Sequence, residues 1–386
     1  VSRMNKVLEV DTVARFARVQ TGITNLAISA AVGPSGFFYA PDPSSQLACT
    51  LAGNIAMNSG GAHCLKYGVT TNNVLGVKMV MMDGSIVEIG GEHLDAEGYD
   101  FLALIIGSEG QLGIVTEATV RILRQAEGAR PMLIGFESTA KASICVSRII
   151  ASGIVPVAIE FMDRPAIEVC EAFAKAGYPL DVEALLIVEV EGSEEEIADR
   201  LAYIAGLAQE VGPSSLVISA DDAQSAKIWK GRKSAFGAIG RKADYLCMDG
   251  TIPLSQLTYV LEEISNICKR YGLGVANVFH AGDGNLHPLI MYDANDPRQA
   301  ERAEQAGADI LRLCVAAGGC LTGEHGVGIE KRDLMRVQFS DVDLAQQMRI
   351  KSLFDERWLL NPAKVFPLDG RPLPASRPAE PAIAAE

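Results

Sequence analysis

Short runs in which apolar and polar residues alternate characterise the first third of the chain. The run VLGVKMVMMDGSIVEIG at 74–90 alternates on both sides of an Asp-Gly pair, which predicts two antiparallel strands joined by a tight turn. The opening residues, 1–10, also have the pattern of a strand, and TEATVRILRQ at 116–125 closes this zone. The segment QAEGARP at 125–131 has the composition of a linker.

Beyond residue 131, apolar strands alternate with longer stretches of helical periodicity. Strand patterns occur at 131–138, 155–162, 184–192, 215–220, 274–280 and 287–293, and helical patterns at 193–212, 297–318 and 341–358. Ser193, followed three residues later by Glu196, predicts a capping box at the start of one helix. Alternation of this kind predicts a sheet that helices cover on one face.

The charge of the chain narrows the range of partners. It has 386 residues and a formal net charge of -14. A surface this acidic repels phosphate backbones, so we expect no nucleic-acid partner and no general attraction to anionic lipid. An anionic substrate therefore needs a local basic pocket. Because no apolar run reaches the roughly 20 residues that span a bilayer, we also expect no transmembrane segment.

The eight cysteines are scattered, with no C-x-x-C pair. This spacing disfavours an iron–sulfur cluster or a thiolate zinc site. Most of these cysteines are expected to be small buried apolar residues. With no signal peptide in view, a reducing cytoplasmic setting fits this usage.

Three of the five histidines lie in two glycine-rich motifs. FHAGDGNLH holds His280 and His287 on either side of a turn, and LTGEHGVGIEKR holds Glu324 and His325. Two imidazoles and one carboxylate form a three-ligand set with an open position, as in catalytic zinc sites. Because adjacent residues point in different directions, His325 is left to act as a general base near neutral pH.

Two other interpretations of these motifs stay open at this stage. Each motif taken separately is equally typical of a tight turn or of unrelated histidines, and only their combination favours a functional site. Two histidines and a glutamate can also activate water, so a metal hydrolase is an alternative hypothesis.

A glycine-rich zone in the first third suggests a bound anion or heterocycle. Gly53, Gly60 and Gly61 are closely spaced, and glycine lets backbone N–H groups approach an anion, while Thr50 and Asn58 can add hydrogen bonds. In a second stretch, GSEGQLGIVTEATV at 107–120, the backbone can present polar groups to a flat heterocycle. Neither stretch is a G-x-G-x-x-G or P-loop motif, so each alone is equally a set of turns.

In combination these motifs resemble one family. HAGDGNLHP, GGCLTGEHGVGIEKRDLM and LNPAKVFP are similar to the C-terminal domain of FAD-linked oxidases, a group that includes the glycolate oxidase catalytic subunit, D-lactate dehydrogenases and D-2-hydroxyglutarate dehydrogenases. The glycine-rich zone resembles the second half of a PCMH-type FAD-binding domain, with Ala52 where the family pattern has a glycine.

The resemblance implies an α+β fold in three parts. These are the second half of a PCMH-type FAD-binding domain at 1–128, a ferredoxin-like α+β substrate (cap) domain with C-terminal helices at 129–368, and a Pro/Ala-rich, disordered tail at 369–386. The family's first glycine-rich loop, of the form RGAGTGLSGG, is not found, and residues 1–10 match the strand that follows it. We therefore expect a product that lacks its first subdomain, with a flavin-deficient or noncatalytic subunit as the alternative function.

The resemblance also implies the roles of individual residues. His280, His287 and Glu324 correspond to the ligands of a divalent metal ion, zinc by preference, and His325 to the catalytic base. The residues implied to hold noncovalent FAD are Pro41, Asp42, Ser44, Thr50, Gly53, Asn54, Asn58, Gly60, Gly61, Tyr67, Glu109, Gly110, Gly113, Ile114, Val115 and Asn361.

On the substrate side, Arg232 matches the family arginine that binds the substrate carboxylate, which a guanidinium does through two bonds. The alternative is an exposed arginine in a KGRK surface run. Where the 2-hydroxyglutarate enzymes have a lysine and a threonine, this chain has Cys247 and Phe236. The expected substrate is therefore a short 2-hydroxy acid such as glycolate or D-lactate. Lys331 is a further candidate for anion contact.

In the implied reaction, the hydroxyl proton is transferred to His325 and a hydride is transferred to the flavin N5. The product is the 2-oxo acid. Electrons then pass to another acceptor, and glycolate oxidase implies companion subunits, one flavin-like and one with iron–sulfur clusters. Such subunits would hold this cytoplasmic chain at the inner face of the membrane.

Overall fold

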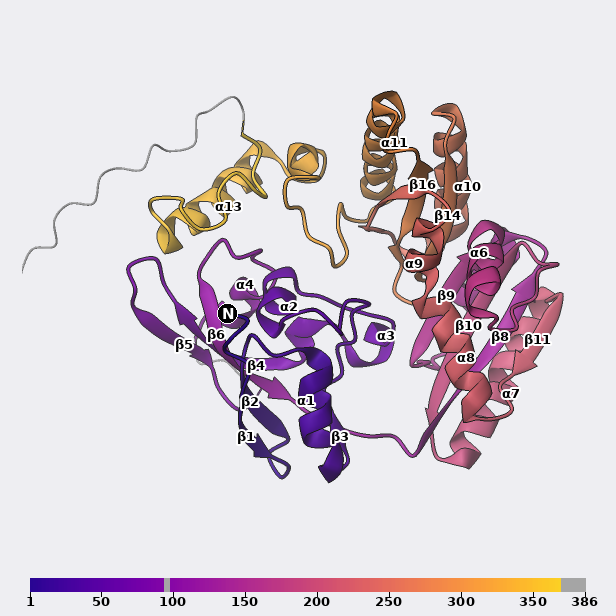
Figure 1. Ribbon diagram of the computed structural model, residues 1–386, viewed down its shortest axis with the longest axis horizontal. Coiled ribbons are helices and arrows are strands. Elements are labelled where there is room, and N and C mark those ends of the chain that lie inside the picture. The colour runs from indigo at the N-terminus through magenta and orange to yellow at the C-terminus, as the bar shows by residue number, and fades with distance from the viewer. Residues whose placement is uncertain (94–97, 369–386) are drawn as a thin grey trace, which may run out of the picture.

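The computed structural model describes residues 1–93 and 98–368, which form two lobes side by side (Figure 1). Residues up to 124 build one lobe and residues from 128 onward build the other. The last long helix then returns over the first lobe. The predicted disordered tail at 369–386 lies outside the described residues.

The first lobe is built on a five-stranded antiparallel sheet. Its strands, in spatial order, are β1 (Val7–Asp11), β2 (Phe16–Gln20), β6 (Ile114–Arg121), β4 (Val74–Val80) and β5 (Ile86–Gly90). The predicted hairpin is confirmed, because β4 and β5 pair antiparallel with Val80 opposite Ile86. A short ladder joins β3 (Phe37–Phe38) to β7 (Leu123–Arg124).

Alternation along these strands separates an apolar face from a polar one. Val19 and Val77 face a buried core that also contains Ile28 and Ile55 from the covering helices. On β2, the neighbouring Arg18 instead forms an exposed ion pair with Glu9 at 2.6 Å. The helices of this lobe are α1 (Asn25–Val32), α2 (Leu51–Met57), α3 (Cys64–Tyr67) and α4 (Phe101–Ile105).

The second lobe starts with a ferredoxin-like unit. Its elements are β8 (Gly128–Phe136), α5 (Thr139–Ala151), β9 (Ala158–Asp163), β10 (Ala184–Gly192), α7 (Glu194–Val211) and β11 (Ser215–Ile218), with α6 (Arg164–Ala174) inserted before β10. The strands pair antiparallel in the order β11-β8-β10-β9. The predicted capping box is present, since Ser193 and Glu196 bond reciprocally at the start of α7.

A second unit has the same order of elements up to its second helix, after which the described residues contain no named strand. It contains β12 (Asp244–Cys247), α10 (Leu257–Arg270), β14 (Gly274–His280), β16 (Pro288–Tyr292) and α11 (Pro297–Ala316), with short strands β13 (Gly250–Thr251) and β15 (Asn285–Leu286). The units join where β9 pairs with β14, and there Phe161 lies opposite Phe279. These two rings stack with their centroids 4.7 Å apart.

Helices cover both faces of this joined sheet, so the prediction of a single covered face is wrong. On β10, Leu186 and Val188 pack into the core beneath α5, α7, α10 and α11. The intervening Leu185 and Ile187 pack into a second core with α6, α8 (Asp222–Lys233) and α9 (Ala235–Gly240). The strand is apolar at nearly every position because both faces are buried, as in other doubly covered sheets.

The C-terminal segment fastens the two lobes together. It contains α12 (Met335–Gln338) and α13 (Asp341–Phe354), so the helix expected at 341–358 ends four residues early. Lys351 of α13 donates to the carbonyl of Gln111 at 2.6 Å and pairs with Asp355 at 2.6 Å. This part of the expected cap domain thus packs on the first lobe. Among the described residues, no helix has both the length and the apolar character needed to cross a membrane.

Candidate active site

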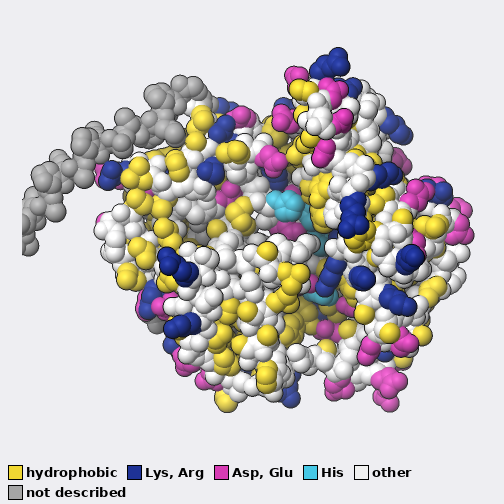
Figure 2. Space-filling view, viewed as in Figure 1, with side chains coloured by type: hydrophobic (Ala, Val, Ile, Leu, Met, Phe, Trp, Pro, Cys, Tyr) yellow, Lys and Arg dark blue, Asp and Glu magenta, His cyan; other side chains and the backbone are white. Residues whose placement is uncertain are grey.

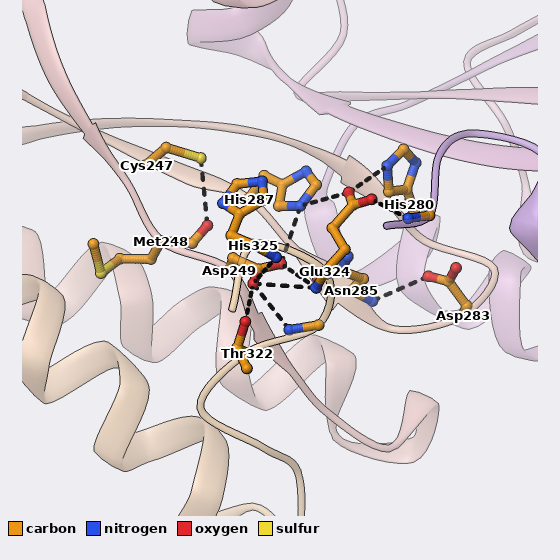
Figure 3. Close-up of polar contacts among 12 residues, drawn as sticks. Cys247, Met248, Asp249, His280, Asp283, Asn285, His287, Thr322, Glu324 and His325 are labelled. Carbon is orange, nitrogen blue, oxygen red and sulfur yellow. Dashed lines mark hydrogen bonds and ion pairs between the residues drawn. The ribbon is translucent and has the colours of Figure 1, made fainter. Parts of the chain in front are cut away.

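The two histidine motifs meet at the inner end of β14. His280 is its last residue and His287 follows the turn, so the two imidazoles lie edge to face with ring centroids 5.2 Å apart. Glu324 Oε1 lies 3.5 Å from His280 Nε2 and 3.4 Å from His287 Nε2 (Figure 3). The three predicted metal ligands are therefore brought together, with one atom from each within 4.8 Å of the others.

His287 shows that this cluster suits a metal ion. Its side chain is 2% exposed, and neither ring nitrogen has a hydrogen-bond partner within the described structure. A buried polar atom without a partner is costly, and coordination of an ion would satisfy it. Two imidazoles and a carboxylate are also a donor set that zinc and similar divalent ions accept.

A buried carboxylate links this cluster to Arg232. Glu160 of β9 is fully buried, and its Oε1 lies 2.7 Å from His280 Nδ1. Arg232 Nε donates to Glu160 Oε2 at 2.7 Å. Burial alone raises the pKa of Glu160, but the neighbouring charges of Arg232 and His280 outweigh it and bring the pKa to about 2. Arg232 is 4% exposed, so it is not the surface arginine of the alternative interpretation.

Asp249 organises the loop that carries Glu324 and His325, here called the His325 loop (322–328). Its carboxylate is fully buried, and it accepts bonds from the backbone N–H of Gly323 at 2.9 Å and of His325 at 2.9 Å. Burial raises the pKa of Asp249, but the nearby His287 ring, with Nε2 3.5 Å from Oδ1, and the charge of Lys331 hold it well below its usual range. The loop therefore wraps around a fixed negative charge.

Lys331 is part of this support. It is 2% exposed, and its Nζ donates to Asp249 Oδ2 at 3.1 Å. The structure thus gives its charge an internal partner, and its contact with a substrate anion stays a prediction.

His325 lies at the open side of the cluster. Its ring stacks on that of His287 with centroids 5.0 Å apart and an angle of 12° between the planes. Its side chain is exposed, yet the surrounding protein lowers its pKa, chiefly through desolvation, despite the charge of Asp249. A histidine with a lowered pKa is unprotonated at neutral pH and can accept a proton. Figure 2 shows histidine side chains in the hollow between the lobes.

The two glycine-rich stretches lie against each other at the end of α2, facing this cluster. The backbone N–H groups of Gly107 and Glu109 donate to the carbonyls of Ile55 and Ala56 at 2.8 and 2.7 Å. Gly110 has a φ of 69°, and a Cβ added there would meet nothing within 4 Å. This open, side-chain-free backbone suits a cofactor that packs against it.

The residues predicted to contact FAD differ in how far the protein itself already uses their polar groups and the space around them. Several already have bonds within the protein through a side chain or backbone group, namely Pro41, Asp42, Thr50, Asn54, Asn58, Gly60, Tyr67, Glu109, Val115 and Asn361. A Cβ at Gly61 or Gly113 would press on Asp42 or Met79. Ser44 and Ile114 are exposed, whereas Gly53 lies within α2 and its N–H donates to Thr50 Oγ1 at 3.2 Å. The open backbone is thus at Gly110.

The lobes touch at the site itself. Gly60 N of the first glycine-rich stretch donates to Glu324 Oε2 at 2.9 Å, so a backbone group of one lobe orients a candidate ligand of the other. A Cβ at Gly60 would lie 3.0 Å from that oxygen, so a side chain at this position would press on the candidate ligand.

Nearby, a charged cluster not predicted from the sequence holds the lobes together. His63 Nδ1 lies 2.7 Å from Asp42 Oδ2, and its Nε2 lies 3.2 Å from Glu189 Oε2 of the other lobe. Burial lowers the pKa of His63, but the two carboxylates overcome this and raise it to about 10. Trp229 Nε1 also donates to Glu189 at 2.6 Å.

Glu160 and Asp249 also went unrecognised in the sequence. Glu160 had a detectable signal, since it is the one charged residue in the apolar strand pattern VPVAIEFM. Asp249 had a weaker signal, because an Asp-Gly pair is equally typical of a turn.

Comparison with known proteins defines the class. The family described as "FAD linked oxidases, C-terminal domain" matches residues 126–365, and "FAD binding domain" matches residues 1–90. The chain therefore belongs to the FAD-linked oxidase family, and the resemblance seen in its motifs is confirmed. It is an FAD-dependent hydroxy-acid oxidoreductase with an α+β fold of the PCMH type.

Individual relatives narrow the comparison. The chain is 46% identical over 368 residues to "Glycolate oxidase subunit GlcD" of Escherichia coli, covering 95% of this chain and 74% of that protein. It is 32% identical to a "D-lactate dehydrogenase" of Archaeoglobus fulgidus, covering 93% and 79% respectively. The solved structure of p-cresol methylhydroxylase shares the fold at a TM-score of 0.75 and 13% identity, covering 96% of this chain and 79% of that one.

Proposed function

We propose that this protein oxidises a short 2-hydroxy acid, glycolate or D-lactate, to the 2-oxo acid. The observation that carries the proposal is the buried chain of contacts from Arg232 through Glu160 to His280. These contacts support the proposal because they join Arg232, a residue type that can bind carboxylates, to the candidate metal cluster. The relatives named glycolate oxidase subunit and D-lactate dehydrogenase support the same substrates. A metal hydrolase would leave the glycine-rich stretches unexplained.

Arg232 is the proposed anchor for the substrate carboxylate. Its Nε and Nη2 face Glu160, at 2.7 and 2.6 Å, so Nη1 is the edge left for a ligand. Phe236, whose ring centroid lies 6.3 Å from that of His287, makes this side of the site apolar. An apolar wall favours a short side chain over a second carboxylate.

His325 is the proposed base. It takes the hydroxyl proton while the hydrogen on the α-carbon leaves with its electron pair, so the C–O single bond becomes a carbonyl. FAD, when bound, supplies the acceptor for that hydride. A divalent ion, when held by His280, His287 and Glu324, supplies polarisation of the substrate oxygens. The protein itself orients the substrate between these groups.

We also propose an electron acceptor and a cellular setting. The Escherichia coli relative is named a subunit, which supports companion chains; the resemblance to glycolate oxidase implies that one is flavin-like and one has iron–sulfur clusters. They would receive the electrons and hold a cytoplasmic protein at the inner face of the membrane.

The first test is anaerobic reduction of the flavin-loaded protein, followed at the flavin band near 450 nm (roughly, as for oxidised flavins). Glycolate or D-lactate is expected to bleach this band, and His325→Ala is expected to slow bleaching by roughly 10²–10⁴-fold, the usual contribution of a general base. His93→Ala, at an exposed histidine outside the site, is the matched control. An unchanged rate in His325→Ala would remove the base assignment.

A further inference from the structure

Glu109 has a backbone conformation that is unusual for its residue type. Its φ is 53°, in the left-handed region that side chains rarely occupy, and its side chain is buried. Such a conformation persists only where surrounding contacts hold it, and it is concentrated at functional sites.

Its carboxylate crosses from the first lobe to the second. Val327 N donates to Oε1 at 2.6 Å and Gly328 N donates to Oε2 at 2.8 Å. Both amides belong to the His325 loop, within three residues of His325 itself. Both oxygens are therefore used to hold this loop.

The backbone of Glu109 is fixed at the same time. Its N–H donates to the carbonyl of Ala56 at 2.7 Å, and its carbonyl accepts from Asn361 Nδ2 at 2.6 Å. The first glycine-rich stretch, the C-terminal segment and the His325 loop thus all meet at this residue.

Gly326, directly after His325, shows how close the contact is. It has a φ of 84°, and a Cβ there would lie 2.9 Å from the Glu109 carboxyl carbon and would collide with Met57. The two lobes are therefore in close contact directly beside His325, the proposed base.

From these contacts we propose that Glu109 is a positioning residue for the oxidation. It fixes the His325 loop against the second glycine-rich stretch, and so sets where the base stands relative to the flavin-binding lobe. This role replaces the direct FAD contact expected from the sequence, and it rests on the proposed function of His325 as the base.

The test is a double-mutant cycle between Glu109→Gln and His325→Ala in flavin-loaded protein. Glutamine has the same size as glutamate, but its NH₂ group would face one of the two loop N–H groups. Two hydrogen-bond donors would then face each other where wild type has a hydrogen bond. Glu109→Gln is expected to slow flavin reduction roughly 10–100-fold, as misplacement of a reacting group does. The substrate concentration at half-saturation and the flavin absorbance spectrum are expected to stay unchanged, whereas the Tm is expected to fall, because a buried amide loses its acceptor. Glu88→Gln, at an exposed glutamate of β5, is the control.

In the His325→Ala background the same substitution is expected to cause no further loss, because Glu109 acts through His325. Equal loss in both backgrounds, a wild-type rate in Glu109→Gln, or loss of the flavin spectrum would each overturn the proposal. Glu109→Asp, which keeps the charge on a shorter arm, is expected to fall between glutamine and wild type. A wild-type rate of flavin reduction in His325→Ala would contradict both the proposed function and this inference. A slow rate in His325→Ala together with a wild-type rate in Glu109→Gln would contradict this inference alone.

Discussion

At the scale of single residues, buried carboxylates organise the candidate site. Glu160 and Asp249 are both fully buried and both ionised, because each lies against positive or donating neighbours. Glu160 orients His280 and Arg232, whereas Asp249 gathers the backbone of the His325 loop. A buried charge is stable only when it is paired in this way.

Glu160→Gln is expected to weaken metal binding. The hydrogen bond from His280 Nδ1 to a carboxylate fixes the ring and makes its other nitrogen a better ligand, so its loss lowers metal affinity roughly 10–100-fold. Titration of metal-free protein with Zn²⁺ measures this directly, without reference to turnover. Glu168→Gln, an exposed position on α6, serves as the control. Equal Zn²⁺ affinity in wild type and Glu160→Gln would contradict the assignment.

At the scale of elements, α13 shows how a terminal helix can support a distant loop. Its Lys351 is 1% exposed and binds the carbonyls of Gln111 and Leu360 as well as Asp355. Gln111 belongs to the second glycine-rich stretch. The helix therefore buttresses this stretch at Gln111.

Lys351→Met is expected to destabilise the protein by about 3–5 kcal/mol, because it leaves the Asp355 carboxylate buried without its partner. The free energy of unfolding in urea measures the effect. Arg349→Met, at an exposed position of the same helix, is expected to change stability by no more than about 0.5 kcal/mol. Similar losses in both variants would show that the buried pair is not what fastens the helix.

At the scale of the whole molecule, the site exists only where the two lobes meet. Gly60 and Glu109 of the first lobe bond to Glu324 and to the His325 loop of the second. His63 adds a half-buried positive charge between Asp42 and Glu189. The protonated imidazole is thus an ionic bridge between lobes.

The contribution of this bridge to stability is expected to fall as the pH rises. The pKa of His63 is raised from 6.5 to about 10 in the folded state, so folding favours the protonated form. Its contribution is therefore complete below pH 6.5 and is lost as the pH rises to about 10. Urea midpoints of wild type and His63→Gln are expected to differ most near pH 6 and to converge toward pH 10. A difference that does not vary with pH would contradict the ionic bridge.

Much of the fold could be predicted from local patterns in the sequence. The hairpin β4–β5, the capped helix α7 and the helix α11 follow from alternation, from Ser193 with Glu196, and from helical periodicity. The sequence did not predict that helices cover both faces of the sheet in the second lobe. Its strand residues are apolar on both faces, and a short apolar run does not reveal how many layers cover it.

The sequence by itself determined the chemistry available to this protein. His280 with His287, and Glu324 with His325, lie in two glycine-rich motifs, so the pairing within each motif is a local property of the chain. These motifs also determine the family to which the chain belongs. Tertiary structure alone decided how the groups are held. Glu160 meets His280 across 120 residues and Glu109 meets Val327 across 218. Because such contacts depend on how whole lobes pack, no spacing along the chain could disclose them.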